Sequence, residues 1–395
     1  MLKGKNILLG VTGGIAAYKA AYLVRLLKKE NANVEVIMTK NAQEFVGKLT
    51  FEVLSENPVY VDTFQREIPY EVEHVSLAKK ADLFIVAPAS ANFIAKARCG
   101  IADDMLTTTF LACKAPKLIA PAMNTGMLEN PATVENLEIL QRRGMAIIDG
   151  EQGFLACKDV GSGRMAEPQD IVEMADFMLG DKDLVGMKIL ITAGPTEEAI
   201  DPVRYLTNRS TGKMGFAVAK VAAQRGADVV LVSGKSQEKD PVGVEVVRVQ
   251  SAAQMHDVVL SRYEDVDVVI KTAAVCDFTP AKPFTEKIKK QNSLPVEFVR
   301  TQDILKELGQ KKTHQILVGF AAETQNILEY AKDKLEQKNL DMVVANDVSQ
   351  EDIGFGSNDN KVSMIRRDGA CLNTQKQSKL EIANLILDQI KEMKN

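Results

Sequence analysis

The sequence lacks an excess of charge of either sign. Its 49 Lys and Arg residues are balanced by 53 Asp and Glu residues, which gives a net charge of −4. A surface for nucleic acid or an acidic membrane needs concentrated positive charge, so neither partner is expected. No apolar stretch is long enough to cross a membrane. Lys3 and Lys5 precede an apolar run as in a signal peptide, but Gly13, Gly14 and Lys19 interrupt that run.

Cysteine is also scarce. The five cysteines are odd in number, widely spaced and without a CxxC pair: Cys99, Cys113, Cys157, Cys276 and Cys371. This pattern argues against a disulfide framework and against a structural zinc site. We therefore expect reduced thiols and a cytoplasmic protein.

What the sequence does contain is an α/β pattern that begins twice. Residues 4–9 read GKNILL and residues 186–191 read GMKILI, and each apolar run leads through a loop into a helical pattern. A chain of 395 residues is too long for one ordinary core. We predict two Rossmann-like α/β domains with mainly parallel sheets, at residues 1–181 and 186–395, joined by a linker at 181–185.

The first turn lacks the GxGxxG pattern of dinucleotide-binding domains. A strand from Ile7 to Val11 leads through Gly13 and Gly14 into a helix from Ala16 to Lys29. On this motif alone, a phosphate site and a plain strand-to-helix turn are about equally favoured. The second strand ends at Thr39, where an NAD site usually has Asp or Glu. Thr39 suits a phosphate better, which favours a mononucleotide such as FMN.

Small and polar residues follow two further strand patterns of the first half. PASAN, with Ser90, Ala91 and Asn92, follows one strand, and PAMNTGM, with Asn124, follows the next. Ligands of open α/β sheets bind at the carboxyl ends of the strands, so these residues are candidate ligand contacts. The glycine-rich residues 150–168 come later, and loops of this length are often functional lids.

The second half opens on the stretch KILITAGPTEEAIDPVRYLTNRSTGKMGFA, residues 188–217. Gly212 to Gly215 lead into a helix, whose N-terminus can hold a phosphate. A later strand, Val266 to Thr272, delivers the segment AAVCDF. Four lysines then gather between Lys282 and Lys290, and the usual meaning of such a run is a solvated loop.

These motifs resemble two enzyme families. PASAN, PAMNTGM, an upstream histidine and LACKDVGSGRM resemble the flavin-dependent cysteine decarboxylases. GPTEEAIDPVRYLTNRSTGKMG, AAVCDF, KIKK, VGFAAET and ANDV resemble the phosphopantothenate–cysteine ligases. In this order, and across essentially the whole chain, they resemble the bacterial fused phosphopantothenoylcysteine decarboxylase/phosphopantothenate–cysteine ligase family of coenzyme A synthesis.

For the first half, the resemblance implies a flavodoxin-like domain that uses FMN to decarboxylate phosphopantothenoylcysteine to 4′-phosphopantetheine. FMN accepts a hydride from the thiol-bearing carbon, which creates the electron sink that loss of CO2 requires. The family makes His74 the active-site base, Asn124 the ligand of the substrate carboxylate and Cys157 the proton donor. Arg164 and Met165 are expected substrate contacts. The residues expected to bind FMN are Gly13, Gly14, Ile15, Thr39, Ser90, Ala91 and Asn92.

For the second half, the resemblance implies ligation of 4′-phosphopantothenate to cysteine through an acyl-cytidylate made from CTP. A carboxylate does not acylate an amine in water until one of its oxygens becomes a leaving group, and Mg2+ and lysines offset the phosphate charge. Asn208 is expected to handle the acyl intermediate and Lys287 to contact the triphosphate, while no metal ligand is assigned. The remaining expected CTP contacts are Ala273, Ala274, Asp277, Gln302, Asp303, Ile304, Leu305, Phe320, Lys334 and Lys338.

The family also implies a homo-oligomer, a dodecamer built from decarboxylase trimers and ligase dimers. Three positions depart from the family pattern. Leu128 stands where an aromatic residue is usual, Lys158 replaces a common glycine, and Gln302 replaces a common proline. The first two could alter cofactor packing or the motion of the glycine-rich loop.

Two other functions remain as alternatives. An NAD(P)-dependent reductase with tandem Rossmann domains is disfavoured by the missing GxGxxG pattern and by the missing acids after Met38 and Val232. A non-catalytic regulatory flavoprotein is disfavoured by the joint presence of His74, Asn124 and Cys157.

Overall fold

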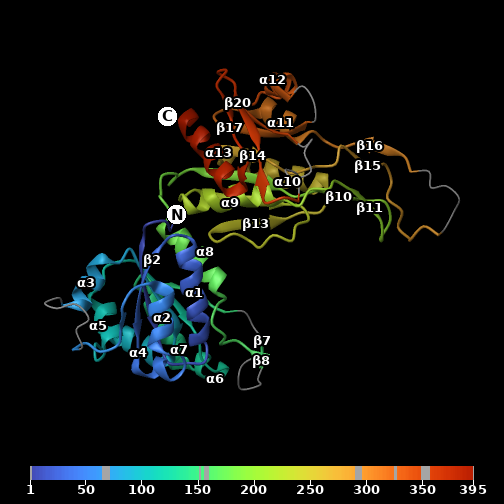
Figure 1. Cartoon of the computed structure of the whole chain (residues 1–395). Coiled ribbons are helices and arrows are strands. Elements are labelled where there is room, and N and C mark those ends of the chain that lie inside the picture. The colour runs from blue at the N-terminus through green and yellow to red at the C-terminus, as the bar shows by residue number, and fades with distance from the viewer. Residues whose placement is uncertain are drawn as a thin grey trace. The chain divides into compact units, whose positions relative to one another are not determined.

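The computed structural model divides the chain into two compact units, Met1–Gly180 and Asp181–Asn395. The structure describes residues 2–64, 72–150, 153–154, 160–289, 296–323, 327–347 and 356–394. None of the helices in these ranges is both long and apolar enough to span a bilayer. Each unit is an α/β sheet with helices on both faces (Figure 1).

The N-terminal unit contains one parallel sheet with the strand order β3-β2-β1-β4-β5-β6. Its strands are β1 (Asn6–Val11), β2 (Asn33–Met38), β3 (Val59–Tyr60), β4 (Leu83–Ala89), β5 (Lys117–Pro121) and β6 (Ala146–Ile147). The six strands have the 3-2-1-4-5-6 order of Rossmann folds, and without the edge strand β3 the other five have the 2-1-3-4-5 order of flavodoxin-like folds. The predicted fold class is confirmed for this unit.

Side chains along each strand of this sheet alternate between its two faces, and each face has its own hydrophobic core. In β1, Leu9 and Val11 belong to one core cluster and Leu8 to the other, as the two-residue period of a strand requires. The first face is covered by α1 (Ala17–Lys29), α2 (Lys48–Ser55) and α8 (Pro168–Leu179). The second face is covered by α3 (Glu73–Lys80), α4 (Ala91–Cys99), α5 (Met105–Ala112) and α7 (Pro131–Arg142).

Several of these helices have a capping residue at their N-terminus. The Asp104 side chain accepts a hydrogen bond from the Thr107 N–H (2.8 Å) at the start of α5. Asn130 caps α7, and Pro131 occupies its first turn. Both starts have the residue types that favour helix N-termini. The remaining short elements of the unit are the 3-10 helix η1 (Lys40–Glu44), α6 (Thr125–Leu128), β7 (Gly153–Phe154) and β8 (Val160–Gly161).

The C-terminal unit contains a larger sheet with the order β13-β12-β9-β14-β17-β18-β20-β21. The first six strands run parallel, namely β13 (Val244–Arg248), β12 (Asp228–Ser233), β9 (Lys188–Ala193), β14 (Val268–Lys271), β17 (Ile316–Glu323) and β18 (Met342–Asp347). β20 (Val362–Arg366) and β21 (Cys371–Asn373) add an antiparallel edge. The chain first adds β12 and β13 on one side of β9. It then adds β14, β17 and β18 on the other side. The topological switch point, where such sheets bind ligands, therefore lies between β9 and β14.

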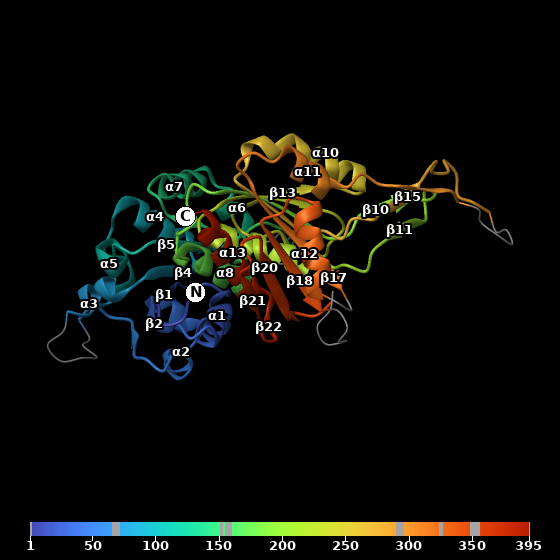
Figure 2. The ribbon, with the colours of Figure 1, turned by 90° about the horizontal axis from the view of Figure 1, so that it is seen from above.

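Helices again cover both faces of this sheet (Figure 2). α9 (Lys213–Gln224) packs against α13 (Lys379–Lys394) on one face. On the other face, α10 (Ala252–Arg262), the 3-10 helix η2 (Tyr263–Asp265), α11 (Ile304–Lys311) and α12 (Ile327–Gln337) bury side chains against Leu190, Val269 and Leu317 of the strands. This unit also matches the predicted fold class.

Two antiparallel ribbons extend from the C-terminal unit beside one another (Figures 1 and 2). One pairs β10 (Glu197–Ala199) with β11 (Tyr205–Thr207), and the other pairs β15 (Phe278–Pro280) with β16 (Phe298–Arg300). They carry exposed apolar side chains, including Tyr205, Phe278 and Phe298. A further short ribbon pairs β19 (Asp359–Asn360) with β22 (Gln377–Ser378).

The segment 181–185, which the sequence suggests as a linker, packs within the C-terminal unit. Leu184 is 1% exposed, and its N–H donates to the Arg225 carbonyl (2.9 Å). The Asp183 carboxylate accepts two hydrogen bonds from the Arg225 guanidinium (2.9 and 2.7 Å). The division between the units therefore falls between Gly180 and Asp181, ahead of the expected domain start at residue 186.

Candidate functional site

In the N-terminal unit, the carboxyl ends of β1 and β2 are held together closely. A Cβ on Gly13 would lie 2.5 Å from the Cβ of Asn41, so only glycine lets the first turn approach η1. The Thr39 N–H donates to the Val11 carbonyl (3.0 Å), and the Thr39 hydroxyl accepts from Ala42 (3.3 Å). The turn with Gly13 and Gly14 thus lies beside the Thr39 loop, as a shared phosphate site requires.

The end of β4 is tied to the same turn. The Thr12 hydroxyl donates to the Pro88 carbonyl (2.8 Å) and accepts from the Ser90 N–H (2.9 Å). The Ser90 hydroxyl also caps α4 by accepting from Phe93 (3.3 Å). Ala91 is half-buried, while Asn92 is exposed, as is the Ile15 side chain on the first turn, with 61% of its surface free.

Asn124 follows β5 and begins α6, with its side-chain oxygen accepting from the Gly126 N–H (2.9 Å). The end of the glycine-rich segment packs on this loop. The Met123 N–H donates to the Gly163 carbonyl (3.0 Å), and the Thr125 hydroxyl donates to the Ser162 carbonyl (2.7 Å). The chain therefore brings Arg164 to the neighbourhood of the Asn124 loop.

Arg164 and Met165 differ in what their side chains face. Arg164 is partly exposed and pairs with Glu167 (3.5 Å), which also holds Lys19 (2.7 Å). Met165 is 2% exposed, and its side chain lies in the core below α1 and α8. Any contact of Met165 with a substrate is therefore restricted to its backbone.

The other two residues expected in the decarboxylase site are His74 and Cys157. His74 is half-buried in the first turn of α3. Cys157 lies outside the described residues. The remaining expected residues meet at the carboxyl edge of the sheet, where α1 begins without a side-chain cap. This donor set fits a phosphate-bearing flavin, because backbone N–H groups at a helix start favour an anion.

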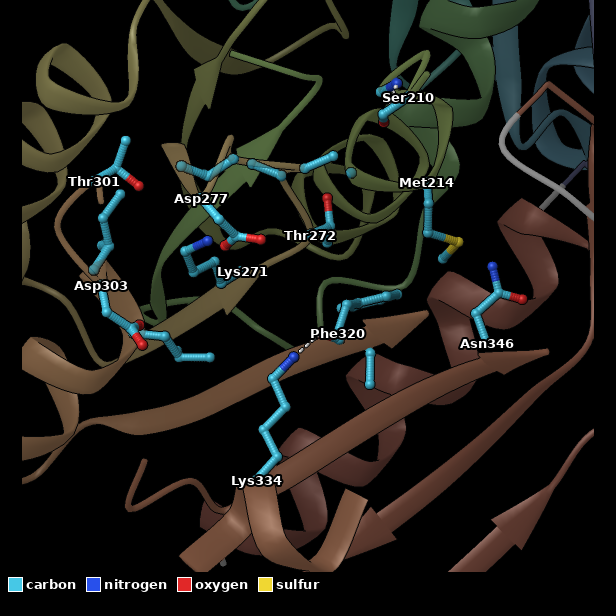
Figure 3. A pocket seen from close by; sticks show the side chains of 18 of the residues that line it. Ser210, Met214, Lys271, Thr272, Asp277, Thr301, Asp303, Phe320, Lys334 and Asn346 are labelled. Carbon is cyan, nitrogen blue, oxygen red and sulfur yellow. Dashed lines mark hydrogen bonds between the residues drawn. The ribbon is translucent and has the colours of Figure 1, made fainter. Parts of the chain in front are cut away.

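In the C-terminal unit, a cavity of about 680 Å3 opens at the switch point between β9 and β14 (Figure 3). Ten of the residues expected to contact CTP line it, namely Ala273, Ala274, Asp277, Gln302, Asp303, Ile304, Leu305, Phe320, Lys334 and Lys338. Side chains separated by more than sixty positions in the sequence thus share one cavity.

Hydrogen bonds to β9 fix the loop that follows β14. The Thr272 hydroxyl donates to the Thr192 carbonyl (2.7 Å), and the Ala273 N–H donates to the Thr192 hydroxyl (3.3 Å). The Ala274 N–H donates to the Gly194 carbonyl (3.0 Å). The backbone that borders the cavity is therefore held on the neighbouring strand.

The charged groups of the cavity are positioned by α11 and α12. Asp303 caps α11 through the Lys306 N–H (3.1 Å) and pairs with Lys338 (3.0 Å). Burial raises the pKa of Asp303, but Lys338 and the Lys306 N–H together lower it below its ordinary value. Lys334, one turn before Lys338, donates to the Phe320 carbonyl (2.6 Å; Figure 3).

Asn208 and Lys287 are placed differently. The Asn208 amide donates to the carbonyls of Ala274 (3.1 Å) and Val275 (3.2 Å), so it lies directly behind the cavity wall. Lys287 is exposed between the two strands of the β15–β16 ribbon, and it does not line the cavity of its own chain. The next residue, Ile288, is anchored by its N–H to Asp201 (3.2 Å).

The cavity includes residues that the motif comparison did not select. Ser210 to Gly215, at the start of α9, line one part of it, and the sequence marked this segment only as a possible phosphate-binding helix start. Lys271 and Lys379 also line it. Nothing in the sequence singled out these two lysines, because one ends a strand pattern and the other begins a surface-like helix.

Burial perturbs both of these lysines. Burial first, and then the charges of Lys334 and Lys338, lower the pKa of Lys271 to about 8. Burial and the charge of Lys213 likewise lower the pKa of Lys379 to about 8. The Lys379 ammonium donates to the Ser357 carbonyl, and Lys213 donates to the Asn358 side chain (2.8 Å). The cavity lining therefore has two groups of interacting lysines, Lys271 with Lys334 and Lys338, and Lys379 with Lys213.

Cysteines and metal-ligating groups add no further site within the described ranges. There, no three His, Cys, Asp or Glu side chains are arranged to hold a metal ion. The four described cysteines, Cys99, Cys113, Cys276 and Cys371, are free thiols.

Comparisons with known proteins assign each unit to a family. Residues 1–179 match the family model described as Flavoprotein, and residues 184–393 match the DNA/pantothenate metabolism flavoprotein C-terminal domain. The chain is similar to the coenzyme A biosynthesis bifunctional protein CoaBC of Bacillus subtilis, with 51% identity over 99% of this chain and 97% of the relative. The CoaBC protein of Vibrio cholerae is 47% identical over 93% of each chain.

A solved structure gives a further likeness. The crystal structure of the C-terminal domain of a coenzyme A biosynthesis bifunctional protein CoaBC is 47% identical. It covers 54% of this chain and 98% of that chain, with a TM-score of 0.47. Because the two bifunctional relatives match over almost their entire length and both family models lie in the same order, the chain belongs to the family of coenzyme A biosynthesis bifunctional proteins, CoaBC.

Proposed function

We propose that the C-terminal unit ligates 4′-phosphopantothenate to cysteine with CTP, and that the N-terminal unit decarboxylates the product to 4′-phosphopantetheine with FMN. The observation that carries this proposal is the near-complete match to bifunctional relatives, joined to a cavity at the switch point of the second sheet. The cytoplasm is the proposed compartment.

The ligase cavity provides the groups that activation of a carboxylate needs. The substrate carboxylate attacks the α-phosphate of CTP, pyrophosphate leaves, and the cysteine amine then displaces CMP. Lys334 and Lys338 supply positive charge for the triphosphate, with Mg2+ as the accompanying ion. Asn208 binds the carbonyls of Ala274 and Val275 and thereby positions the backbone next to the reacting groups.

The other end of the cavity suits the phosphate of 4′-phosphopantothenate. The start of α9 presents backbone N–H groups, and Gly212 has a positive φ of 83°, which favours glycine. Lys213 and the buried Lys379 provide positive charge at the same end. The distance between the two groups of cations then separates the substrate phosphate from the nucleotide.

The decarboxylase site is proposed at the carboxyl edge of the first sheet. FMN, when bound, supplies the hydride acceptor that makes loss of CO2 feasible. Gly13, Gly14 and Thr39 would hold its phosphate, with Ile15, Ser90, Ala91 and Asn92 as the neighbouring contacts. His74 acts as base, and Asn124 and Arg164 bind the substrate carboxylate. Cys157 donates the final proton, a role open to a thiol because the reference pKa of cysteine is about 8.5.

The position of Lys287 leads to the proposed assembly. This lysine is exposed on a ribbon and lies outside the cavity of its own chain, so it would act in the cavity of a second copy. The exposed apolar side chains of Tyr205, Phe278 and Phe298 on the ribbons support contact with that copy. Ligase dimers and decarboxylase trimers together would give a dodecamer.

Mass spectrometry of the products from 4′-phosphopantothenate, cysteine and CTP tests the function. We expect CMP, pyrophosphate and 4′-phosphopantetheine, and no ligation when the nucleotide is omitted. Lys287→Gln should lose ligation, on the order of 10²-fold, yet decarboxylate supplied phosphopantothenoylcysteine. Cys157→Ser should ligate normally and accumulate an oxidised, decarboxylated enethiol. Turnover of a nicotinamide cofactor without these products would support the reductase alternative instead.

A further inference from the structure

Lys271 occupies an unusual place in the ligase cavity. It is the last residue of β14, directly at the switch point of the sheet, and it is half-buried. What remains exposed lines the cavity, and Figure 3 shows Lys271 and Asp277 pointing into the same part of it. A lysine at the end of a central strand has no role in packing the core, so its ammonium group requires another explanation.

The charges around Lys271 do not neutralise it. Lys334 and Lys338 repel its ammonium group, while Asp277 and Asp303 attract it. Asp303 is already paired with Lys338 (3.0 Å) and caps α11. Within the described part of the chain, no hydrogen bond is formed by the Lys271 ammonium. The part of the cavity around Lys271 therefore collects three ammonium groups against two carboxylates.

When the cavity is empty, Lys271 can lose its proton, so that less positive charge is buried in the cavity. Burial, with the repulsion from Lys334 and Lys338, brings its pKa to about 8, so that near this pH about half of the molecules carry a neutral amine. A polyanion in the cavity would raise the pKa of Lys271 again. Its negative charges would favour the ammonium form and draw a proton from the solvent.

We propose that Lys271 is a third cation for the triphosphate of the nucleotide, and that it takes up a proton when the nucleotide binds. The inference rests on the proposed ligase function and adds a residue that none of the family motifs contains. The triphosphate is the preferred partner because Lys271, Lys334 and Lys338 lie at the same end of the cavity. The phosphate of the acid substrate is assigned to the end with Lys213 and Lys379.

Calorimetric titration of the full chain with CTP at pH 8, in two buffers with different heats of ionisation, measures the proton directly. We expect the wild type to take up a fraction of a proton per bound CTP and much less per bound CMP, which lacks two of the phosphates. Above pH 8, CTP affinity should fall by up to about tenfold per pH unit, because the free enzyme must first be protonated.

Variants assign that proton to its residue. Lys271→Met should abolish the uptake and weaken CTP binding roughly 10- to 100-fold at pH 7.5. Lys271→Arg should also abolish uptake but keep the charge, so its affinity should not fall between pH 8 and pH 9.5. Lys379→Met removes the other lysine with a pKa near 8 and should leave the CTP-linked uptake in place. Lys376→Met, an exposed lysine outside the cavity lining, should match the wild type.

Two different results separate the failure of this inference from the failure of the function. CTP binding and ligation without proton uptake, or an unchanged pH profile in Lys271→Met, would overturn the role of Lys271 and leave the ligase function standing. A wild type that neither binds CTP nor releases pyrophosphate from it would overturn the CTP-dependent ligase function, and this inference with it.

Discussion

The buried guanidinium of Arg225 gives the sharpest prediction about where the ligase unit begins. Only 7% of its side chain is exposed, and it is satisfied by Asp183 (2.9 and 2.7 Å), Asp388 (2.7 Å) and the Asn384 carbonyl (3.3 Å). Lys391 also pairs with Asp183 (2.8 Å). The segment 181–185 therefore supplies one of two carboxylates to a buried cation.

The perturbation compares two C-terminal fragments, one beginning at Asp181 and one at Gly186. The shorter fragment loses Asp183 and leaves Arg225 with the Asp388 carboxylate and the Asn384 carbonyl. Removing one partner of a buried pair costs about 3–5 kcal/mol. Because 29% of the Asp183 side chain is exposed and the Asp388 carboxylate remains, we expect a cost of about 2 kcal/mol here. Loss of the buried Leu184 adds about 2 kcal/mol. The total of roughly 4 kcal/mol is a large part of the 5–15 kcal/mol that stabilises a typical domain.

Urea denaturation of both fragments, together with CTP-dependent pyrophosphate release, measures the effect. We expect the fragment from Asp181 to fold and ligate without flavin, and the fragment from Gly186 to unfold at clearly lower urea. Within the longer fragment, Asp183→Asn should reproduce part of the loss. Asp181→Asn, an exposed control two positions away, should change nothing.

The pH dependence gives an independent check of the same pair. The hydrogen bond from Arg225 is the main cause that lowers the pKa of Asp183, opposed by burial and assisted by Lys391. A carboxylate with a lowered folded-state pKa stabilises the protein above its unfolded pKa of about 4 and loses this effect as the pH falls further. The deficit of Asp183→Asn should therefore shrink in acid. Equal urea midpoints for the two fragments would show that Arg225 does not depend on residues 181–185.

Three further predictions concern single side chains. Although burial lowers it, hydrogen bonds to Glu307 and Asp257 raise the pKa of His256, so His256→Gln should cost about 1 kcal/mol at pH 6 and less at pH 8.5, as measured by urea denaturation. Asn208→Asp places a carboxylate beside the cavity wall, so coupling to cysteine should fail more severely than pyrophosphate release in a paired assay. Gly163 has a φ of 123°, and a Cβ there would lie 2.3 Å from a backbone carbonyl, so Gly163→Ala should reduce decarboxylation and spare ligation. Gly47→Ala, with open space around it, is the matched control, and equal decarboxylation rates in the two would contradict the packing argument.

Much of the fold follows from local signals in the sequence. The predicted strand from Ile7 to Val11 and the predicted helix from Ala16 to Lys29 agree with β1 and α1 to within one residue at each end. Asn130 and Pro131 begin α7 as their capping preferences require. These features can be predicted because the residues that determine them lie within a few consecutive positions.

The features that sequence patterns missed depend on contacts between distant residues. The sequence predicts that the polar segment 181–185 is a linker. In the structure it belongs to the second unit, because Asp183 binds Arg225, which also binds Asp388. The family resemblance predicts Met165 as a substrate contact, and only the fold shows that its side chain lies in the core, so that such a contact would come from its backbone. The sequence shows Lys271 only as a residue near the end of a strand. The fold lowers its pKa by burial and brings Lys334 of α12 close enough to lower it further.

The crowding of cations in the ligase cavity also affects the folded unit as a whole. With the cavity empty, keeping Lys271 buried disfavours its proton, which lowers the free energy of unfolding below about pH 8. This penalty eases as the pH rises toward 10.5, where the unfolded lysine loses its proton as well. A ligand that restores the charge also removes the penalty, in addition to the ordinary stabilisation by binding. A bound nucleotide would therefore also stabilise the fold of the unit, and we expect the nucleotide-loaded form to resist unfolding best.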